Sequence, residues 1–238
     1  ELGRPVLTGI SKFSKNYNEL SDKWNPENKI PDLLDSFKSS LVDRLMSDVP
    51  LGIVLSGGLD SSLIAALVAK YGDNSKLDTF SIGMPGSIDL YYADLVAKHI
   101  GSNHHHVEIS ENDFLNSIDE VIYKIESYDI TTVRASVGNY LVSKYIKNNS
   151  DCKVIFNGDG SDEVCCGYFY LKNSPDLESL QQESQKLIDE IYLFDVLRSD
   201  RSISSNGLEP RTPFLDLSLI HISEPTRLLS IGEDGENK

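Results

Sequence analysis

VLSGGLDSSLIAALVAK, residues 54–70, joins a short apolar run to a longer one through a turn of two glycines. Hydroxyl side chains flank the glycines, at Ser56, Ser61 and Ser62. Gly57 and Gly58 carry no side chain, so the backbone of the turn can approach a ligand closely. The first N–H groups of the following helix have no partner within the helix, and the helix dipole favours an anion there. The turn therefore predicts a phosphate-binding loop.

One acidic residue, Asp60, lies within this turn. Its charge would repel a phosphate unless a divalent cation lay between them, and Mg²⁺ is the natural bridge. The stretch has neither the Lys of the G-x-x-x-x-G-K-[ST] motif nor the spacing of G-x-G-x-x-G. Without that Lys, the loop suits a departing pyrophosphate better than transfer of a terminal phosphoryl group. The alternative interpretation is a plain strand-to-helix turn whose serines cap the helix.

Short apolar runs alternate with helical patterns along the chain. The expected strands lie at residues 52–56, 77–83, 104–110 and 153–158. The expected helices lie at residues 30–49, 61–71, 89–101, 114–125, 135–147 and 177–201. This alternation predicts an α/β fold, a doubly wound parallel sheet with flanking helices.

The composition limits the classes of function. The 238 residues include 39% hydrophobic and 25% charged side chains, as in ordinary globular proteins. A net charge of −15 argues against binding to a nucleic-acid backbone, because no basic cluster offsets it. No apolar run approaches the roughly 20 residues of a membrane span, and no signal peptide opens the chain. Three cysteines, two of them adjacent, suit a reduced protein without a disulfide framework, so we expect a cytoplasmic location.

A second motif, NGDGSDEVCCGY at residues 157–168, follows the fourth expected strand. Asp159, Asp162 and Glu163 place three carboxylates within five residues. The motif lies at the carboxyl end of its strand, where doubly wound sheets bind ligands. It could hold Mg²⁺ or receive a cationic group, whereas the alternative is an Asp-rich turn that caps a helix. The phosphate loop on a neighbouring strand favours the functional interpretation.

Five stretches occur in order along the chain: MSDVPLGIVLSGGLDSS, FSIGMPGSIDL, YDITTVRAS, NGDGSDEVCCGY and RTPFLD. Together they resemble the synthetase domain of the class B, glutamine-hydrolysing asparagine synthetases over residues 41–216. This family belongs to the N-type ATP pyrophosphatases, so the resemblance implies an adenine nucleotide alpha hydrolase-like fold. The implied partners and cofactors are aspartate, ammonia, ATP and Mg²⁺, with a homodimer as a further expectation and neither nucleic acid nor membrane.

The resemblance implies a reaction in two steps. The side-chain carboxylate of aspartate attacks the α-phosphate of Mg-ATP, which gives β-aspartyl-AMP and pyrophosphate. Ammonia, supplied from glutamine by a separate N-terminal domain, then displaces AMP to give asparagine. Two alternatives stay open at this point: a truncated nucleotide-binding fragment without catalysis, and another pyrophosphate-loop enzyme such as a β-lactam synthetase.

The resemblance also implies roles for particular residues. Pyrophosphate would bind at residues 55–62, through Leu55, Ser56, Gly57, Gly58, Asp60, Ser61 and Ser62. The adenosine would be framed by Leu55, Ile82 and the backbone of Asn157 and Gly158. Asp60 and Asp162 are the expected Mg²⁺ ligands.

A further group of implied residues would carry the chemistry. Aspartate and its acyl-adenylate would lie beside Thr131, Thr132 and Arg134. Arg134 is the side chain of this group that can hold a carboxylate through two hydrogen bonds. Asp159 would lie close to the incoming amine or the adenylate. These four residues are the expected catalytic part of the site.

The second motif departs from the family pattern S-G-E-G-S-D-E-x-F-G-G-Y at Asn157, Asp159, Cys165 and Cys166. Asp is one methylene shorter than Glu, and a displaced carboxylate costs rate at a preorganised site. The adjacent cysteines are expected to be buried as small apolar residues. In the His-His-His run at residues 104–106, the middle side chain of a strand would face away from the other two, so we assign no metal site there.

The resemblance divides the chain into three parts. Residues 1–29 are the expected linker from a missing N-terminal glutaminase domain, and residues 30–216 are the expected synthetase domain. Residues 217–238 depart from the family, show no helical period and provide no counterpart of the family's Lys that neutralises charge on the phosphates. We therefore expect this tail to pack poorly or to be disordered.

Overall fold

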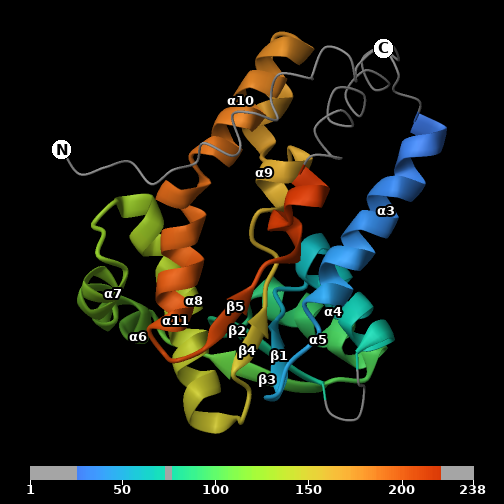
Figure 1. Cartoon of the computed structure of the whole chain (residues 1–238). Coiled ribbons are helices and arrows are strands. Elements are labelled where there is room, and N and C mark those ends of the chain that lie inside the picture. Colours follow the sequence, from blue (N-terminus) through green and yellow to red (C-terminus); the bar gives the residue numbers. More distant parts are fainter. Residues whose placement is uncertain (1–25, 73–76, 221–238) are drawn as a thin grey trace.

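The computed structural model describes residues 26–72 and 77–220 and shows an α/β fold around one five-stranded sheet (Figure 1). The strands are β1 Leu51–Val54, β2 Asp78–Gly83, β3 Asn103–Glu108, β4 Val154–Phe156 and β5 Glu209–Arg211. Their order is β3-β2-β1-β4-β5, and every neighbouring pair is parallel. The predicted doubly wound parallel sheet is confirmed.

Strand β5 is the one strand of the described sheet that has no counterpart among the expected strands. Its three residues include Pro210, and proline is typical of turns. Nevertheless, β5 pairs with β4 at the edge of the sheet. Proline is tolerated on an edge strand because its missing N–H group need not donate to a neighbour. A strand this short therefore carries no recognisable pattern of its own.

Helices cover both faces of the sheet. Figure 1 shows α3, α4 and α5 on one side and α7, α8 and α11 on the other. The α-helices are α3 Pro26–Asp43, α4 Leu59–Tyr71, α5 Ile88–Ile100, α6 Glu111–Asn116, α7 Ile118–Ile125, α8 Ile130–Asn149, α9 Ser161–Cys165, α10 Leu177–Asp189 and α11 Ser202–Ser204. The 3₁₀ segments are η3 Phe169–Asn173, η4 Ile191–Leu193 and η6 Pro213–Leu215, and η5 Val196–Arg201 is a π-helix.

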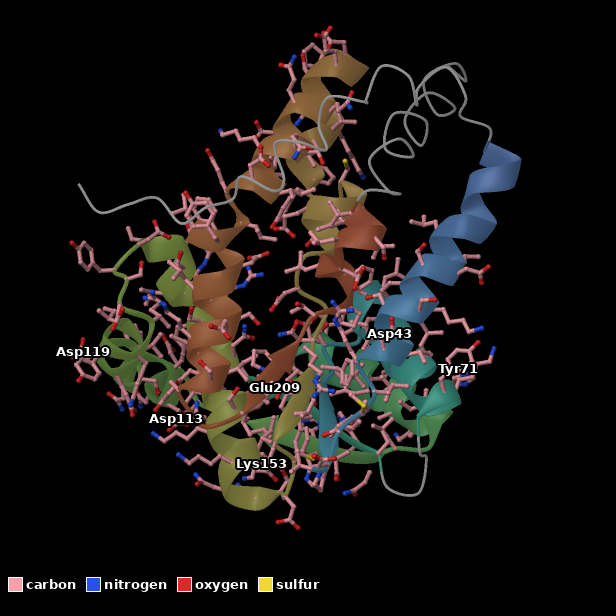
Figure 2. All side chains as sticks on the ribbon, viewed as in Figure 1. Asp43, Tyr71, Asp113, Asp119, Lys153 and Glu209 are labelled. Atoms are coloured by element: carbon pink, nitrogen blue, oxygen red, sulfur yellow. The ribbon has the colours of Figure 1, made fainter. Side chains whose placement is uncertain are left out.

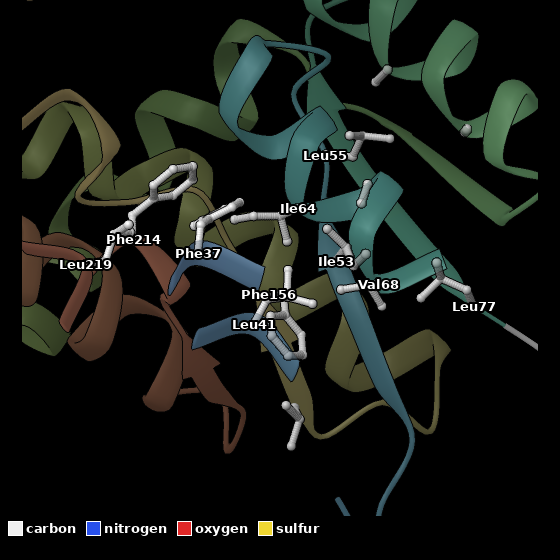
Figure 3. Close-up of a cluster of buried hydrophobic side chains, with 14 residues drawn as sticks. Phe37, Leu41, Ile53, Leu55, Ile64, Val68, Leu77, Phe156, Phe214 and Leu219 are labelled. Carbon is white, nitrogen blue, oxygen red and sulfur yellow. The ribbon is translucent and has the colours of Figure 1, made fainter. Parts of the chain in front are cut away.

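The central strands are buried on both faces, as parallel strands between two helical layers must be. On one face, Ile53 and Phe156 pack with side chains of α3 and α4 in the hydrophobic cluster of Figure 3. On the other face, Phe80 and Ile155 pack with side chains of α8 and α11. Phe156 and Ile155 are neighbours in β4, so the period-two alternation of the strand divides them between the two clusters.

Charged side chains lie on the outside of this framework, as Figure 2 shows for Asp43, Asp113, Asp119, Lys153 and Glu209. The acidic excess of the chain is thus carried in part by a solvated surface. Within the described ranges, no helix is both long and apolar enough to cross a membrane.

Several helix boundaries differ from the predictions. Helix α8 begins at Ile130 rather than 135, because Asp129 Oδ2 accepts a hydrogen bond of 2.8 Å from the Thr132 N–H group and so caps the helix. The expected helix over 114–125 is two helices, which meet at Ser117. The expected helix over 177–201 ends at Asp189 and gives way to short 3₁₀ and π-helical segments.

The structure tests the expected ends of the synthetase domain at only a few residues. Helix α3 begins at Pro26, so residues 26–29 of the expected linker are helical. Residues 217–220 form a helical turn in which Leu219 and Ile220 are buried, so these four residues of the expected tail are packed. Residues 1–25 and 221–238 lie outside the described residues, and the predictions made for them stay predictions.

Candidate active site

A cavity of about 280 Å³ opens at the carboxyl ends of β1 and β4. These two strands are hydrogen-bonded neighbours, and the chain order reverses between them, which is the topological switch point where doubly wound sheets bind ligands. The lining residues come from β1, α4 and the loop between them, from the β4–α9 loop with α9 and the segment after it, and from α8, η5 and α11. They are Val54, Ser56, Gly58, Asp60, Ser61, Asn139, Val142, Asn157, Gly158, Asp159, Gly160, Ser161, Asp162, Glu163, Tyr168, Arg198 and Ile203.

The predicted phosphate loop forms one wall of this cavity. The Ser56 and Ser61 hydroxyl oxygens lie 3.0 Å apart and share a hydrogen bond, and the Ser56 N–H group donates to Ser61 Oγ at 3.2 Å. Gly58 is the N-cap residue of α4, and no side chain caps the helix there. The serines therefore do not cap the helix, contrary to the alternative interpretation. The first-turn N–H groups of α4 carry no side-chain cap, as an anion-binding helix terminus requires.

Gly57 packs closely against α5. Its φ angle is +78°, and an added Cβ atom would lie 2.5 Å from the backbone nitrogen of Ala93 and from Tyr92 Cβ. The missing side chain thus lets the loop pack on α5, and Gly57 does not line the cavity. Gly158 joins the two loops, because a Cβ atom there would lie 3.3 Å from Asp60 Cβ.

The second loop is organised by Asn157, which is buried. Its side-chain Nδ2 donates to Ser199 Oγ at 2.6 Å, and its Oδ1 accepts from the Asp159 N–H group at 3.3 Å. The first bond ties the loop to η5, and the second holds the backbone of Asp159. The departure from the family pattern at position 157 therefore has a structural use in this chain.

Five ionisable side chains gather at one end of the cavity or directly behind it. Arg198 Nη2 lies 3.2 Å from Asp159 Oδ1 and 2.5 Å from Asp195 Oδ1. The Tyr168 hydroxyl donates to Glu163 Oε1. Within the described part of the chain, Asp159 Oδ2 and Asp195 Oδ2 are buried carboxylate oxygens without a hydrogen-bond partner. The carboxylates thus outnumber the donors around them.

Burial sets the protonation of these groups. Burial raises the pKa of Asp195 to about 8; Arg198 opposes this rise, and Glu163 and Asp159 add to it. A proton on Asp195 would supply the donor that its buried carboxylate lacks when ionised, with Glu163 as the neighbouring acceptor. Burial also raises the pKa of Asp162, and the neighbouring carboxylates of Asp60 and Glu163 raise it further.

The structure brings only part of the predicted site together. The cavity includes Ser56, Gly58, Asp60, Ser61, Asn157, Gly158, Asp159 and Asp162. Leu55, Gly57, Ser62, Ile82, Thr131, Thr132 and Arg134 do not line it. The Leu55 side chain is fully buried in the core, and its N–H group donates to the Phe80 carbonyl at 2.8 Å. Ile82 packs against the second hydrophobic cluster.

The three predicted residues of the YDITTVRAS stretch lie in the first turns of α8. Thr131 and Arg134 are exposed there, and Thr132 is buried. The same helix reaches the cavity further along, through Asn139 and Val142. Seven residues separate Thr132 from Asn139, so they lie on one side of α8, about 10 Å apart along its axis. The roles expected for Thr131, Thr132 and Arg134 stay predictions.

Four residues of the cavity lie outside both motifs and were not expected there: Asn139, Val142, Arg198 and Ile203. Arg198 lies in the segment 177–201 that was expected to be one long helix, and Ile203 follows that segment; nothing in the sequence marks either residue as functional. Tyr168 ends the second motif, and its proximity to Glu163 was the one signal that local spacing offered.

The two loops present carboxylates but no complete metal cage. Among the described residues, no group of three or more His, Cys, Asp or Glu side chains is arranged to hold a metal ion. The side chains of the His-His-His run alternate between the two faces of the strand, as predicted. His104 and His106 both approach Asp94, at 3.4 and 3.5 Å, whereas His105 pairs with Asp78 at 2.9 Å.

The adjacent cysteines are not both buried, so that expectation is wrong. Cys165 is exposed at the end of α9, and Cys166 is half-buried in a left-handed turn with a φ angle of 55°. Helix α9 has only five residues, so its last side chain projects beyond the core.

Comparison with known proteins identifies the family. The family model described as asparagine synthase matches residues 32–181. The glutamine-hydrolysing asparagine synthetase of Rattus norvegicus is 49% identical over 208 residues, which is 85% of this chain and 37% of that protein. The corresponding enzyme of Homo sapiens is 49% identical over 198 residues, which is 81% of this chain and 35% of that protein. This chain thus spans about a third of the length of these curated relatives.

Among solved structures, the U34-tRNA thiolase NcsA of Methanococcus maripaludis aligns with a TM-score of 0.47 and 16% identity, over 87% of this chain and 67% of that one. The sequence match, which covers both loops of the cavity, decides the assignment. The chain belongs to the asparagine synthase family.

Proposed function

We propose that this chain carries the synthetase reaction of its family, the ATP-dependent conversion of aspartate to asparagine. The observation that supports this most directly is the meeting of the uncapped phosphate loop and the acidic loop in one cavity at the switch point of the sheet. The first loop offers N–H groups and two hydroxyls to an anion, and the second offers carboxylates to a cation.

The first step of the proposed reaction needs a held pyrophosphate. The aspartate carboxylate oxygen forms a bond to the α-phosphorus of ATP, and the bond from that phosphorus to the bridging oxygen breaks. Pyrophosphate leaves with the bonding electrons. The N–H groups at the start of α4, with Ser56 and Ser61, would bind its charge. The prediction that Leu55, Ile82 and the backbone of Asn157 and Gly158 frame the adenosine stays part of this proposal.

Mg²⁺ fits the residues that face the cavity. Asp60 and Asp162 both line it, and the charge of Asp60 contributes to the raised pKa of Asp162, so the two carboxylates repel each other. Mg²⁺ commonly binds through one or two carboxylates together with substrate phosphates, which agrees with the absence of a three-residue cage among the described residues. When bound, the ion would neutralise charge on the departing pyrophosphate.

The second step needs ammonia. In the proposal, ammonia attacks the carbonyl carbon of β-aspartyl-AMP, the C–N bond forms, one proton leaves the nitrogen, and the C–O bond to AMP breaks. The ammonia would come from glutamine, through a glutaminase domain outside this chain, and the reaction would take place in the cytoplasm. Asp159 faces the cavity and would lie beside the incoming amine.

One observation favours a second candidate, a fragment that binds nucleotide without turning it over. Among the cavity-lining residues of the described chain, Arg198 is the one basic side chain, and it is already paired with two aspartates. No Lys from this part of the chain is therefore in place to neutralise the phosphates during adenylation.

The test uses the purified chain with Mg-ATP, aspartate and ammonium chloride. Equal amounts of AMP, pyrophosphate and asparagine support the proposal. Binding of Mg-ATP without AMP release supports the inert fragment. Formation of ADP, or no binding of ATP at all, would overturn the assignment of the loop to pyrophosphate.

A further inference from the structure

Arg198 bridges two carboxylates of unequal exposure. Its Nη2 atom lies 2.5 Å from Asp195 Oδ1 and 3.2 Å from Asp159 Oδ1. The Asp195 side chain is 4% exposed, whereas that of Asp159 is 19% exposed and lines the cavity. One partner is thus fixed inside the fold, and the other faces the space for substrate.

The fold holds Arg198 from several sides. Asp195 is the N-cap residue of the π-helix η5, and Arg198 follows three residues later. Its backbone N–H group donates to the Phe194 carbonyl at 2.9 Å, and its own carbonyl accepts a hydrogen bond from Ser202 Oγ. One residue on, Ser199 accepts the 2.6 Å bond from Asn157 that ties η5 to the Asp159 loop. π-Helical turns are rare and often occur at functional sites.

The Asp159 carboxylate is held through one oxygen only. Oδ1 accepts a hydrogen bond from Arg198, and Oδ2 is buried without a partner in the described part of the chain. A buried carboxylate oxygen without a donor is costly. The Asp159 side chain as a whole is 19% exposed and lines the cavity, so an amine there would be a donor for this carboxylate.

Because the Asp159 side chain is short, the position of its carboxylate depends on the hydrogen bond from Arg198. The family pattern has Glu at this position, and Asp cannot reach as far into the cavity. A guanidinium behind the carboxylate fixes the direction of Oδ2, because Asp195 in turn fixes the guanidinium. A single hydrogen bond from a mobile side chain would leave that direction undefined.

We propose that Arg198, anchored by Asp195, is a positioning residue that presents the Asp159 carboxylate to the amine in the second step. This inference rests on the proposed function. In that step the nitrogen of the ammonia adduct loses one proton to the Asp159 carboxylate: an N–H bond breaks and an O–H bond forms. The C–O bond to AMP then breaks, and AMP leaves with the bonding electrons.

The test compares four variants of the chain: Arg198→Gln, Arg198→Lys, Asp159→Asn and the double variant Arg198→Gln/Asp159→Asn. We expect Arg198→Gln to lower kcat for asparagine formation by about 100-fold, the usual cost of a misplaced catalytic group. The KM for ATP should change less than 2-fold, because the variant keeps the expected ATP and Mg²⁺ contacts at residues 55–62, Asn157, Gly158 and Asp162. Arg198→Lys keeps the charge and should recover part of kcat. In the Asp159→Asn background, Arg198→Gln should cause no further loss.

Equal losses from Arg198→Gln in both backgrounds would overturn the proposal, because Arg198 would then not act through Asp159. Arg201→Gln is the matched control: Arg201 lies on the same π-helix, pairs with the exposed Glu126 at 3.1 Å and does not line the cavity. Its kcat should stay within 2-fold of the parent value.

Arg198→Gln takes away the hydrogen-bond donor of the buried Asp195 Oδ1, so it could unfold the chain for a purely structural reason. The variant Asp195→Asn/Arg198→Gln replaces both side chains of this pair with neutral amides and serves as the second test. It should fold and stay as slow as Arg198→Gln, because Asp159 is still unrestrained. Full activity in this double variant would show that Arg198 only neutralises Asp195, and would overturn the proposal.

Thermal unfolding separates this proposal from the proposed function. If the parent chain forms no AMP, the proposed function fails, and the ion pair is then tested by the unfolding midpoints of Arg198→Gln, Asp159→Asn and their double variant. A double-variant loss smaller than the sum of the single losses supports the Arg198–Asp159 restraint. Additive losses would overturn it.

Discussion

Gly158 touches Asp60 across the cavity wall: a Cβ atom on Gly158 would lie 3.3 Å from Asp60 Cβ and 3.3 Å from the Ser61 backbone nitrogen. The two loops are therefore in van der Waals contact at the point where one carries a phosphate-binding turn and the other its carboxylates. A methyl group at this position would push on backbone, which yields less easily than the end of a side chain.

We therefore expect Gly158→Ala to shift Asp60 and weaken binding of Mg-ATP by about 10-fold, a binding cost of about 1.4 kcal/mol. Isothermal titration calorimetry measures the change. The control is Gly138→Ala in α8, where an added Cβ atom meets nothing within 4 Å. That variant should bind Mg-ATP normally and gain about 0.5–1 kcal/mol of stability. Equal affinity of both variants would contradict the contact between the loops.

Gly57→Ala should destabilise the fold, because the new side chain would meet the backbone of α5. The matched control is Gly86→Ala. Both glycines have similar positive φ angles, +78° and +80°, but only Gly57 has neighbours within 4 Å. The left-handed conformation costs each alanine variant roughly 1–2 kcal/mol, and overpacking should add about 1–3 kcal/mol at Gly57 alone. Urea unfolding measures the stability of both variants. Equal losses of stability would show that α5 moves away from the new side chain at little cost.

Asp60→Asn should remove the dependence of ATP binding on Mg²⁺. The mutation deletes one proposed ligand and also a charge that repels phosphate, so affinity without metal should rise while affinity with metal falls. Titrations of ATP with Mg²⁺ and with EDTA check both directions. Asp89→Asn is the control, because Asp89 is also an acidic first-turn residue, on α5, but it is exposed and does not line the cavity. A parent-like response to Mg²⁺ in Asp60→Asn would refute the ligand assignment.

The raised pKa of Asp195 should make the free energy of unfolding depend on pH. Its pKa rises from 3.8 to about 8 because of burial, so between these values the folded chain binds more protons than the unfolded chain. The associated stability is present at low pH and is lost as pH rises through this window. Asp195→Asn should flatten the profile between pH 5 and 8, although it also removes the ionic partner of Arg198. Denaturant unfolding at several pH values measures this slope, and an unchanged slope would contradict the raised pKa.

Cys166→Gly should stabilise the chain by about 1 kcal/mol, because Cys166 has a φ angle of 55° that glycine adopts without strain. The family pattern has Gly at this position. Glu126→Gly offers a comparison at a φ angle of 54°, at the end of α7. Thermal unfolding compares the two variants, and a loss at Cys166 would show that its side chain contributes packing that outweighs the backbone strain.

Much of the fold was predictable from the sequence because its signals are local. Apolar runs of strand length, helical periods and the left-handed Gly101 that ends α5 lie within a few residues of the elements that they define. The two loops were predictable for the same reason, since each motif is contiguous. Strand β5 could not be predicted, because three residues that include a proline show no strand pattern and because its pairing with β4 is a long-range contact.

The amino-acid sequence by itself determined the parallel α/β sheet, the two loops and the family, all through short-range patterns. Only the tertiary structure decided which residues complete the cavity. Arg198 lies 39 residues beyond Asp159, and no local spacing relates them. Arg134, contiguous with a family motif, is instead exposed at the start of α8. The physical reason is that the position of a side chain in a site depends on how helices pack on the sheet, which brings distant residues together through burial and charge pairing.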